Sequence, residues 1–338
     1  MRVSVLGDGD QLLREALSAV RDTSWSGDHY VFSPVTGGTQ ATVWRGRCDL
    51  PHLPEVAVRL TPKPAALIDR IGSLVNRVEG VVCPQTLAVA TLETGGRTWT
   101  VHVCTWIGKG AASWSDPFGL GQAIARLHEQ LACGGQDFTD RGLSFEPSPV
   151  PAADDVAQLP AWFVARHLWR DRVLPQFAEQ GARLPVQPIH GDMHGDNVVS
   201  ADGGFGFIDF DKLMHAPRAF DLAKLIATGF FKVQGGEPVK FLQSRAMDLI
   251  DGYRSVQPLQ YAELVAIEGF AVILNSEIAR LGIAYDVASY REQADAVGSW
   301  WTKRRRYRPG NPLGIRRPDP AHASPWAQQL AFFPDAER

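Results

Sequence analysis

The chain has 338 residues, of which 45% are hydrophobic and 21% charged, so it can bury a large core and is long enough for about two domains. Its net charge of −3 and pI near 6.3 argue against a nucleic-acid binder, which is usually basic. No apolar run approaches the roughly 20 residues of a membrane span, and residues 1–20 contain no signal-like apolar block. The four cysteines lack paired spacing, which indicates reduced thiols. We therefore expect a cytoplasmic protein without a membrane or nucleic-acid partner.

The first hundred residues have the pattern of a small β-rich domain. Short apolar runs alternate there with glycine-containing turns, one at Gly37-Gly38-Thr39 and another at Gly95-Gly96. The predicted elements, in chain order, are a helix at 10–21, strands at 30–35, 43–46 and 55–60, a helix at 65–78, a strand entered after residue 84, and a strand at 98–106. The pattern predicts a sheet built from hairpins and accompanied by helices.

From Gly108 onward the pattern becomes helical. Phe118, Ala123, Ile124 and Leu127 recur at roughly helical spacing. Residues 134–159 carry three prolines and are predicted to form a long loop. Further helices are predicted at 162–182, 220–231, 238–254, 260–281 and 289–303, and residues 304–320 are predicted to be extended.

The most informative segment is H-G-D-M-H-G-D-N at residues 190–197. It has the pattern H-x-D-x-x-x-x-N, with the Asp-to-Asn spacing of the protein-kinase catalytic loop. Residues 197–200 and 205–208 are apolar-rich runs separated by A-D-G-G, which predicts a β-hairpin. That hairpin would set Asn197 beside Asp209, so that one hard cation could take an oxygen from each. Asp192 could face the same cation from the substrate side.

Residues 190–223 carry H-G-D-M-H-G-D-N-V-V, then F-I-D-F-D, then A-P-R-A-F-D-L-A, and they resemble the signature of the aminoglycoside phosphotransferase-like kinases (APH/choline kinase type). The resemblance is specific there and diffuse elsewhere. It implies an α+β, protein-kinase-like bilobal fold. Residues 1–107 would be a nucleotide-binding lobe with an antiparallel sheet and a helix, and residues 108–338 a mainly helical catalytic and substrate-binding lobe. It also implies ATP, or GTP, with Mg²⁺ as cofactors and a small-molecule hydroxyl as acceptor.

The same resemblance assigns roles around the segment. Asp192 would be the catalytic base, and Asn197 and Asp209 the magnesium ligands. Asp221 would be a structural carboxylate that holds the loop. Asp211 lies where the family often has an acidic residue, which supports the metal or faces the substrate.

In the N-terminal region, the resemblance places the cover of the nucleotide phosphates at Gly37, Gly38 and Thr39, where backbone N–H groups can approach closely. V-A-V-R at residues 56–59 aligns with the kinase string V-A-I-K. Ala57 would then lie against the adenine, and Arg59 would replace the phosphate-binding lysine. Arginine is a permanent cation but is not interchangeable with lysine at a tight site.

Four more residues complete this nucleotide site. Lys63 is an alternative cation, although the prolines on either side indicate that it has left the strand. Asp69, on the following helix, is the expected acidic partner of Arg59. Cys104 and Trp106 lie at the expected hinge between the lobes, where backbone groups would meet the adenine edge, and Trp106 is alternatively a core residue.

Two readings from other classes stay open. Residues 191–195 match the G-D-x-H-G string of metal-dependent phosphoesterases, but the further strings that those enzymes need are absent and D-R-G at 140–142 lies upstream. Arginine at position 59 favours a nucleotide-binding module without catalysis, whereas the intact motif residues oppose it. His190 and His194 have a spacing seen in zinc sites, yet no further ligands follow, so we expect structural roles, with His190 close to the base or the substrate.

The acceptor is the least determined part of the prediction. Glu263, Glu268, Glu277 and Asp286 are acidic candidates for a polyamine substrate, although their ordinary density favours a solvated helix face. Trp300 could stack on a sugar or base, or pack in the core. We expect a monomeric or homodimeric kinase that phosphorylates an antibiotic and confers resistance, with a sugar, amino alcohol or nucleoside as the alternative acceptor.

Overall fold

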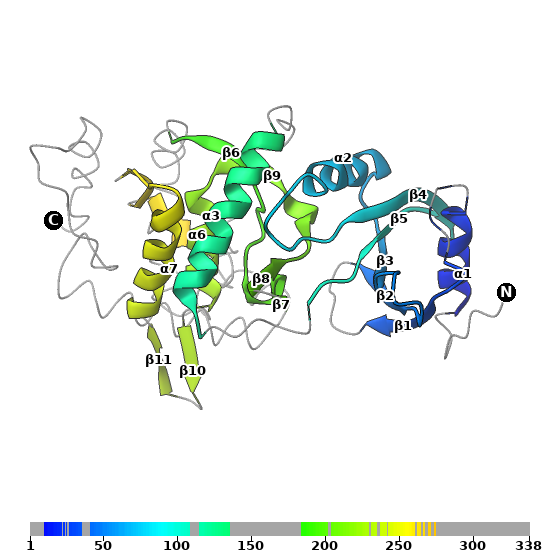
Figure 1. The fold of residues 1–338 in the computed structure, drawn as a ribbon, viewed down its shortest axis with the longest axis horizontal. Helices are drawn as coiled ribbons and strands as arrows, with labels where there is room; N and C mark the ends of the chain where they lie inside the picture. The colour runs from blue at the N-terminus through cyan, green and yellow to red at the C-terminus, as the bar shows by residue number, and fades with distance from the viewer. Residues whose placement is uncertain are drawn as a thin grey trace, which may run out of the picture. The chain divides into compact units, whose positions relative to one another are not determined.

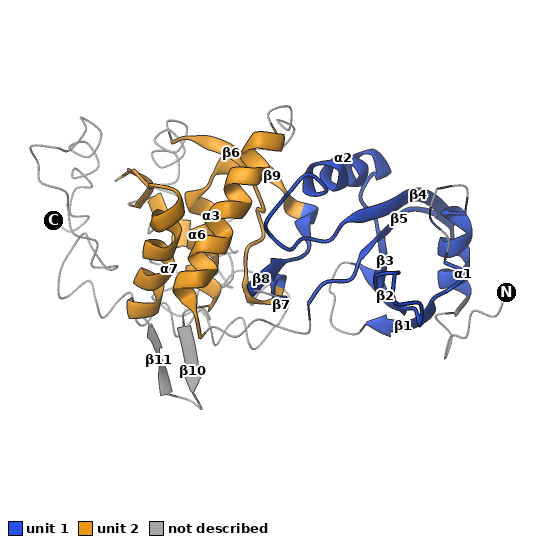
Figure 2. Cartoon of the chain, viewed as in Figure 1, with its two compact units in different colours: residues 1–112, 197–211 blue, residues 113–196, 212–338 orange. Residues whose placement is uncertain are grey.

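The structure is a computed structural model, and it describes residues 10–21, 23, 25, 27–35, 41–108, 115–135, 184–201, 204–229, 231–234, 237–241, 243–260, 262–264, 266–267, 270–271 and 274. The chain divides into two compact units (Figure 2). Unit 1 contains residues 1–112 and 197–211, and unit 2 contains residues 113–196 and 212–338. Within the described ranges, no helix is both long enough and apolar enough to cross a membrane.

A five-stranded antiparallel sheet forms the centre of unit 1 (Figure 1). Its strands are β1 (Val31–Val35), β2 (Thr42–Arg47), β3 (Val56–Thr61), β4 (Thr86–Thr94) and β5 (Arg97–Thr105). Their order is β1-β2-β3-β5-β4, and every neighbouring pair is antiparallel. Gly95 and Gly96 have φ values of 59° and 70° in the β4–β5 turn, a backbone conformation that favours glycine. The predicted sheet is confirmed.

Two helices accompany this sheet. α1 (Asp10–Ala19) and the residue after it bury Leu13, Ala16, Leu17 and Val20, which is the spacing of one helix face. These side chains share an apolar cluster with Trp44 and with other buried residues of the strands. α2 (Ala65–Val75) buries the face that carries residues 68, 71, 72, 74 and 75. Both helices begin where the sequence predicted them and end two or three residues earlier.

The predicted hairpin after Asn197 is also confirmed, and it belongs to unit 1. Its strands are β7 (Val198–Ala201) and β8 (Gly204–Phe207), which pair antiparallel. The N–H of Phe207 donates to the carbonyl of Val82 at 3.0 Å, which ties the hairpin to the segment before β4. Single turns of 3₁₀ helix flank it, η1 (Gly195–Asn197) before and η2 (Phe210–Lys212) after.

Helices make up most of the described part of unit 2. It contains α3 (Pro117–Gly134), α6 (Ala219–Gly229) and α7 (Gln243–Val256), with the strand pairs β6 (Val186–Ile189) with β9 (Met214–Pro217) and β10 (Phe231–Gln234) with β11 (Glu237–Phe241). Asp116 caps α3 by accepting a hydrogen bond from the N–H of Gly119 at 2.8 Å. At the contact between α3 and α7, a Cβ on Gly121 or Gly252 would clash with the backbone of the other helix. These two glycines let the helices approach closely.

Some elements differ from the prediction. The predicted helix at 238–254 begins only at Gln243, because residues 237–241 pair with β10 and satisfy their backbone groups there. β6 and β9 were not predicted, since each is only four residues long and contains a proline. Described residues between 262 and 274 are helical, as predicted. The predicted helices at 162–182 and 289–303 and nearly all of the loop at 134–159 lie outside the described residues.

Candidate active site

The loop after β6 is held through its backbone by one buried carboxylate. Asp221, in the first turn of α6, accepts hydrogen bonds from the N–H of His190 at 2.8 Å and of Gly191 at 2.9 Å. Gly191 has a φ of 77°, and a Cβ there would clash with the carbonyl of Lys212. The glycine and the carboxylate together fix the path of the chain into Asp192.

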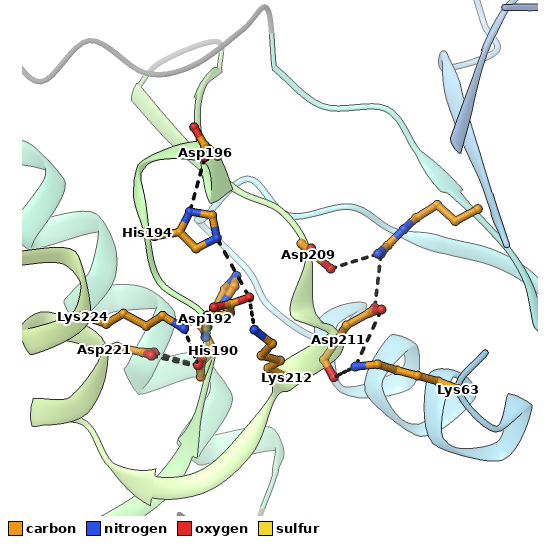
Figure 3. A network of polar contacts seen from close by, with 12 residues as sticks. Lys63, His190, Asp192, His194, Asp196, Asp209, Asp211, Lys212, Asp221 and Lys224 are labelled. Atoms are coloured by element: carbon orange, nitrogen blue, oxygen red, sulfur yellow. Dashed lines mark hydrogen bonds and ion pairs between the residues drawn. The ribbon is translucent and has the colours of Figure 1, made fainter. Parts of the chain in front are cut away.

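Two lysines meet the side chain of Asp192 (Figure 3). Lys224 donates to Oδ1, and the ammonium of Lys212 lies 2.9 Å from Oδ2. Burial alone would raise the pKa of Asp192, but the charges of Lys224 and Lys212 hold it well below its usual range. Asp192 is therefore an oriented, ionised carboxylate.

The two histidines of the segment both contact Asp192. His190 is fully buried, and its Nδ1 accepts a hydrogen bond from the N–H of Asp192 at 3.2 Å. His194 lies between Asp192 and Asp196, with nitrogen to oxygen distances of 4.0 and 3.8 Å (Figure 3). Burial lowers the pKa of His194. Among the described residues, no three His, Cys, Asp or Glu side chains gather into a metal site.

The hairpin brings Asn197 and Asp209 side by side at its open end. Val198 pairs with Phe207, and the N–H of Ile208 donates to the carbonyl of Asn197 at 3.0 Å. Asn197 is buried, whereas the Asp209 side chain is 42% exposed. Asp209 has a φ of 63°, the only positive value at a non-glycine residue of the described chain. A strained backbone of this kind persists where the surroundings fix it, often at functional sites.

Arg59 of β3 binds two carboxylates of unit 1. Its guanidinium lies 2.9 Å from Asp209 Oδ1 and 3.3 Å from Asp211 Oδ1. Lys63 adds a second cation, because its Nζ donates to the carbonyl of Asp211 at 2.6 Å and lies 3.8 Å from the carboxylate (Figure 3). Burial alone would lower the pKa of Arg59, but the charges of Asp211 and Asp209 raise it.

The expected pairing of Arg59 with Asp69 is corrected by this arrangement. Asp69 lies on the exposed side of α2, because the helix turns Ile68 and Ile71 inward, and the described partners of Arg59 come from the hairpin instead. Arg59 also lines a pocket in unit 1 whose other lining residues are Ile68, Ile71, Gly72, Val75, Pro84, Thr86, His102, Cys104, Asp209, Phe210 and Asp211.

The residues expected near adenine lie on β3 and at the end of β5. Ala57 and Cys104 are paired in the sheet and both buried. Burial raises the pKa of the Cys104 thiol to about 11. Trp106 donates its backbone N–H to the carbonyl of Glu55 at 2.7 Å, and the Arg45 guanidinium stands 4.8 Å from the centre of its ring. Trp106 therefore packs within unit 1.

Comparison with known proteins gives the family. The model of the phosphotransferase enzyme family (APH) matches residues 32–259, which is more than half of the chain. The chain belongs to the APH phosphotransferase family. A curated relative is the homoserine kinase of Phenylobacterium zucineum, 28% identical over 217 residues, 60% of this chain and 57% of that protein. The chain spans about half the length of the curated relatives it matches.

Solved structures share the fold of this APH phosphotransferase family chain. An amicoumacin kinase in complex with AMP-PNP and Ca²⁺ matches with a TM-score of 0.61 at 13% identity, over 88% of this chain and 93% of that one. A choline/ethanolamine kinase family protein from Mesorhizobium loti matches with a TM-score of 0.56 at 18% identity, over 87% and 94%. The expected α+β, kinase-like fold is confirmed.

Other expected site residues of this APH chain fall into two groups. Gly37, Gly38, Thr39, Glu268 and Trp300 lie outside the described residues. Glu263, considered as an acidic contact for a cationic substrate, is fully buried, and its carboxylate lies 2.7 Å from Arg218. Because that charge is already paired inside the helical unit, the polyamine hypothesis loses one of its candidates.

Sequence reasoning missed Lys224 and Lys212. Lys224 lies within the apolar run A-F-D-L-A-K-L-I-A and three residues after Asp221, so both are on one side of α6. A lysine on the buried side of an amphipathic helix is a signal that could have been used, because a lone buried charge is costly without a partner. Lys212 directly follows the F-I-D-F-D motif and carried no signal of its own.

Proposed function

We propose that this APH-family chain transfers the γ-phosphoryl group of ATP to a hydroxyl of a small molecule. Asp192 would address the acceptor hydroxyl, and the observation that carries the proposal is the oriented, ionised carboxylate in a loop held by Asp221. In the reaction, the acceptor oxygen forms a bond to the γ-phosphorus. The bond between the γ-phosphorus and the oxygen that bridges it to the β-phosphate breaks, and ADP departs. The hydroxyl proton passes to Asp192 and then to solvent.

The low basicity of Asp192 suits this chemistry. Phosphoryl transfer passes through a loose transition state, so positioning and charge neutralisation contribute more than early proton removal. A carboxylate fixed by two ammonium groups is a good positioner and a weak base. Its backbone and side chain are both constrained, which supports a role in orienting the acceptor.

Asn197 and Asp209 would hold Mg²⁺. The amide and carboxylate oxygens are ligands that hard cations prefer, and the hairpin sets the two residues side by side. A metal ion bound there would neutralise charge on the nucleotide phosphates. Asp209 already meets the Arg59 guanidinium at 2.9 Å, so the same carboxylate would organise both positive groups. Asp211, which pairs with Arg59 and Lys63, supports that arrangement.

For the nucleotide, we propose that residues 1–107 form the binding lobe and residues 108–338 the catalytic and substrate-binding lobe. Gly37, Gly38 and Thr39 would cover the phosphates, Ala57 and the Cys104 to Trp106 segment would contact adenine, and Arg59 would contact the phosphates. Buried Ala57 and Cys104 on adjacent strands support an apolar adenine site. ATP is the proposed phosphoryl donor, with GTP as the alternative. Because the reaction would depend on this nucleotide, we propose that it takes place in the cytoplasm.

An antibiotic hydroxyl is one proposed acceptor, and the solved amicoumacin kinase supports it as a protein of the same fold. A metabolic acceptor is the second candidate. The curated relatives named homoserine kinase favour an amino-acid hydroxyl such as that of homoserine. The pairing of Glu263 with Arg218 also removes one acidic group that a polycationic antibiotic would need.

One experiment tests the reaction and chooses the acceptor. The protein is incubated with Mg-ATP and a panel of antibiotics, homoserine, choline, sugars and nucleosides, and a mass gain of one phosphoryl group identifies the acceptor. Asp192→Ala should abolish the gain while its circular dichroism spectrum and ATP affinity stay unchanged. An active Asp192→Ala variant would overturn the assignment. ATP binding without transfer to any acceptor would favour a non-catalytic nucleotide-binding module. Hydrolysis of phosphomonoesters with manganese and without ATP would instead favour a phosphoesterase.

A further inference from the structure

One side of α6 contacts the loop that contains Asp192 at two points. Asp221 accepts from the two backbone N–H groups before Asp192, as described above. Lys224, three residues further along the helix, donates to the Asp192 carboxylate and lies 3.5 Å from the carbonyl of Gly191. The helix thus contacts both the backbone and the side chain of the loop, with charges of opposite sign.

The two lysines at Asp192 differ in their surroundings. The side chain of Lys224 is 17% exposed and lies among buried apolar residues of α6, whereas that of Lys212 is 44% exposed. An exposed ammonium can exchange a carboxylate for water or for a substrate anion at little cost. A buried ammonium cannot leave its partner without a large desolvation penalty. Lys224 is therefore the fixed contact of Asp192 and Lys212 the exchangeable one.

The fold itself gives no reason for a lysine at position 224. Replacing buried ion pairs with apolar residues of similar size is often neutral or stabilising. The neighbouring positions Ala223, Leu225 and Ile226 are buried and apolar, so an apolar side chain would suit this helix. Burial lowers the pKa of Lys224, which is the cost of placing a charge there. The ion pair with Asp192 offsets that cost, and it holds the Asp192 carboxylate in one orientation.

We propose that Lys224 is a positioning residue for Asp192: it fixes the carboxylate through Oδ1, so that Oδ2, once the more exposed Lys212 releases it, is the oxygen that meets the acceptor hydroxyl. The inference rests on the proposed function, since it assigns a partner to the proposed base. The other charged or titratable groups described near Asp192 are Lys212, His194, Asp221 and His190, whose Nδ1 accepts from the Asp192 N–H, together with Asp196, which contacts His194. Asp221 is engaged with backbone N–H groups and His190 with the Asp192 N–H, whereas Lys224 and Lys212 are the cations that contact the Asp192 carboxylate itself.

The test uses Lys224→Met, which keeps the length of the stem and removes the charge, and Lys224→Arg, which keeps the charge. Lys212→Met removes the exchangeable cation from the same carboxylate. Arg254→Met removes a half-exposed cation from α7 and is the matched control away from the site. The acceptor is the compound that the panel identifies, and inorganic phosphate release from ATP is followed in parallel.

The first readout is the titration of the Asp192 carboxyl by ¹³C NMR, with its signal assigned by its loss in Asp192→Asn. In the unaltered protein Asp192 should stay ionised well below pH 3.9, the ordinary value. Lys224→Met should raise its midpoint by at least one pH unit, because an opposite charge at contact distance lowers a carboxyl pKa by about 1–3 units. Arg254→Met should not move it. An unaltered protein whose Asp192 titrates near 3.9, or a Lys224→Met variant with no change in midpoint, overturns the proposal.

The second readout is kinetic. Lys224→Met should lower kcat about 10- to 100-fold with little change in the KM for ATP, and shift the acid limb of kcat/KM upward, while Lys224→Arg recovers part of the rate. If Lys224→Met lowers the unfolding temperature without moving the acid limb of kcat/KM, Lys224 is purely structural and the proposal is contradicted. If Lys224→Met does not fold, Lys224→Gln replaces it. Absence of any transfer by the unaltered protein refutes the proposed function and the positioning role with it, whereas normal transfer with an unmoved Asp192 titration refutes the positioning role alone.

Discussion

Removal of the Asp221 carboxylate should destabilise unit 2 more than any single surface change. The side chain is fully buried, accepts from the N–H groups of His190 and Gly191, and lies 3.1 Å from Nε2 of His128. In Asp221→Ala both backbone N–H groups lose their partner, and each unsatisfied buried donor costs about 1–3 kcal/mol. We expect a loss of about 3–5 kcal/mol, comparable with breaking a buried ion pair.

Urea denaturation followed by circular dichroism measures this loss. With an m-value of about 3 kcal/mol/M, the midpoint should fall by at least about 1 M. Asp221→Asn keeps one acceptor oxygen and should lose less. Asp251→Ala is the matched control, because its carboxylate is half exposed and 3.4 Å from Arg254, and the expected change is within about 0.5 kcal/mol. A loss below about 1 kcal/mol in Asp221→Ala would show that the loop does not depend on this carboxylate.

Three further predictions concern groups whose environment is known. Burial lowers the pKa of His102 to about 3, so between pH 3 and 6.5 the folded chain binds fewer protons than the unfolded chain. The protein should therefore lose stability as the pH falls from 6.5 toward 3. A midpoint near 6.5 in an NMR titration of the His102 imidazole would contradict this. Gly252→Val would push a side chain into the backbone of Phe118 and should cost at least about 1–3 kcal/mol, and an unchanged Tm would refute the close approach. At pH 8 the exposed Cys133 should react with a thiol reagent well before buried Cys104, whose pKa is raised to about 11, and the reverse order would be inconsistent with the fold.

The sheet, the hairpin and their glycine turns could be predicted because they depend on local patterns. Strands such as β3 are short apolar-rich runs, interrupted in β3 by Arg59, and the β7–β8 hairpin closes within a few residues. β6 and β9 could not be predicted, since their pairing joins segments 25 or more residues apart and places Pro188 and Pro217 in strands. The start of α7 was misplaced for a related reason, because the pairing of β11 is a non-local choice that helical periodicity does not reveal.

The same distinction applies to the candidate site. The spacing of Asp192, Asn197 and Asp209 is a property of one continuous segment, and the sequence alone sets the last two on adjoining ends of a hairpin. The partners of Arg59 lie 150 and 152 positions away, so no sequence pattern could choose them over the nearby Asp69. The partner of Lys224 could not be predicted either, because Asp192 lies 32 positions away, although a lysine within an apolar helical run indicates a buried charge.

Polar contacts connect the loop that contains Asp192 to a distant part of unit 2. Asp221 meets His128, whose other ring nitrogen lies 2.9 Å from the hydroxyl of Tyr253. That hydroxyl donates to Gln257, which also accepts from Arg218, the partner of Glu263. A shortened version of the protein cut at residue 259, where the family match ends, would remove Glu263 and leave Arg218 short of its charge partner. Expression fragments for crystallisation or screening should therefore extend past residue 263.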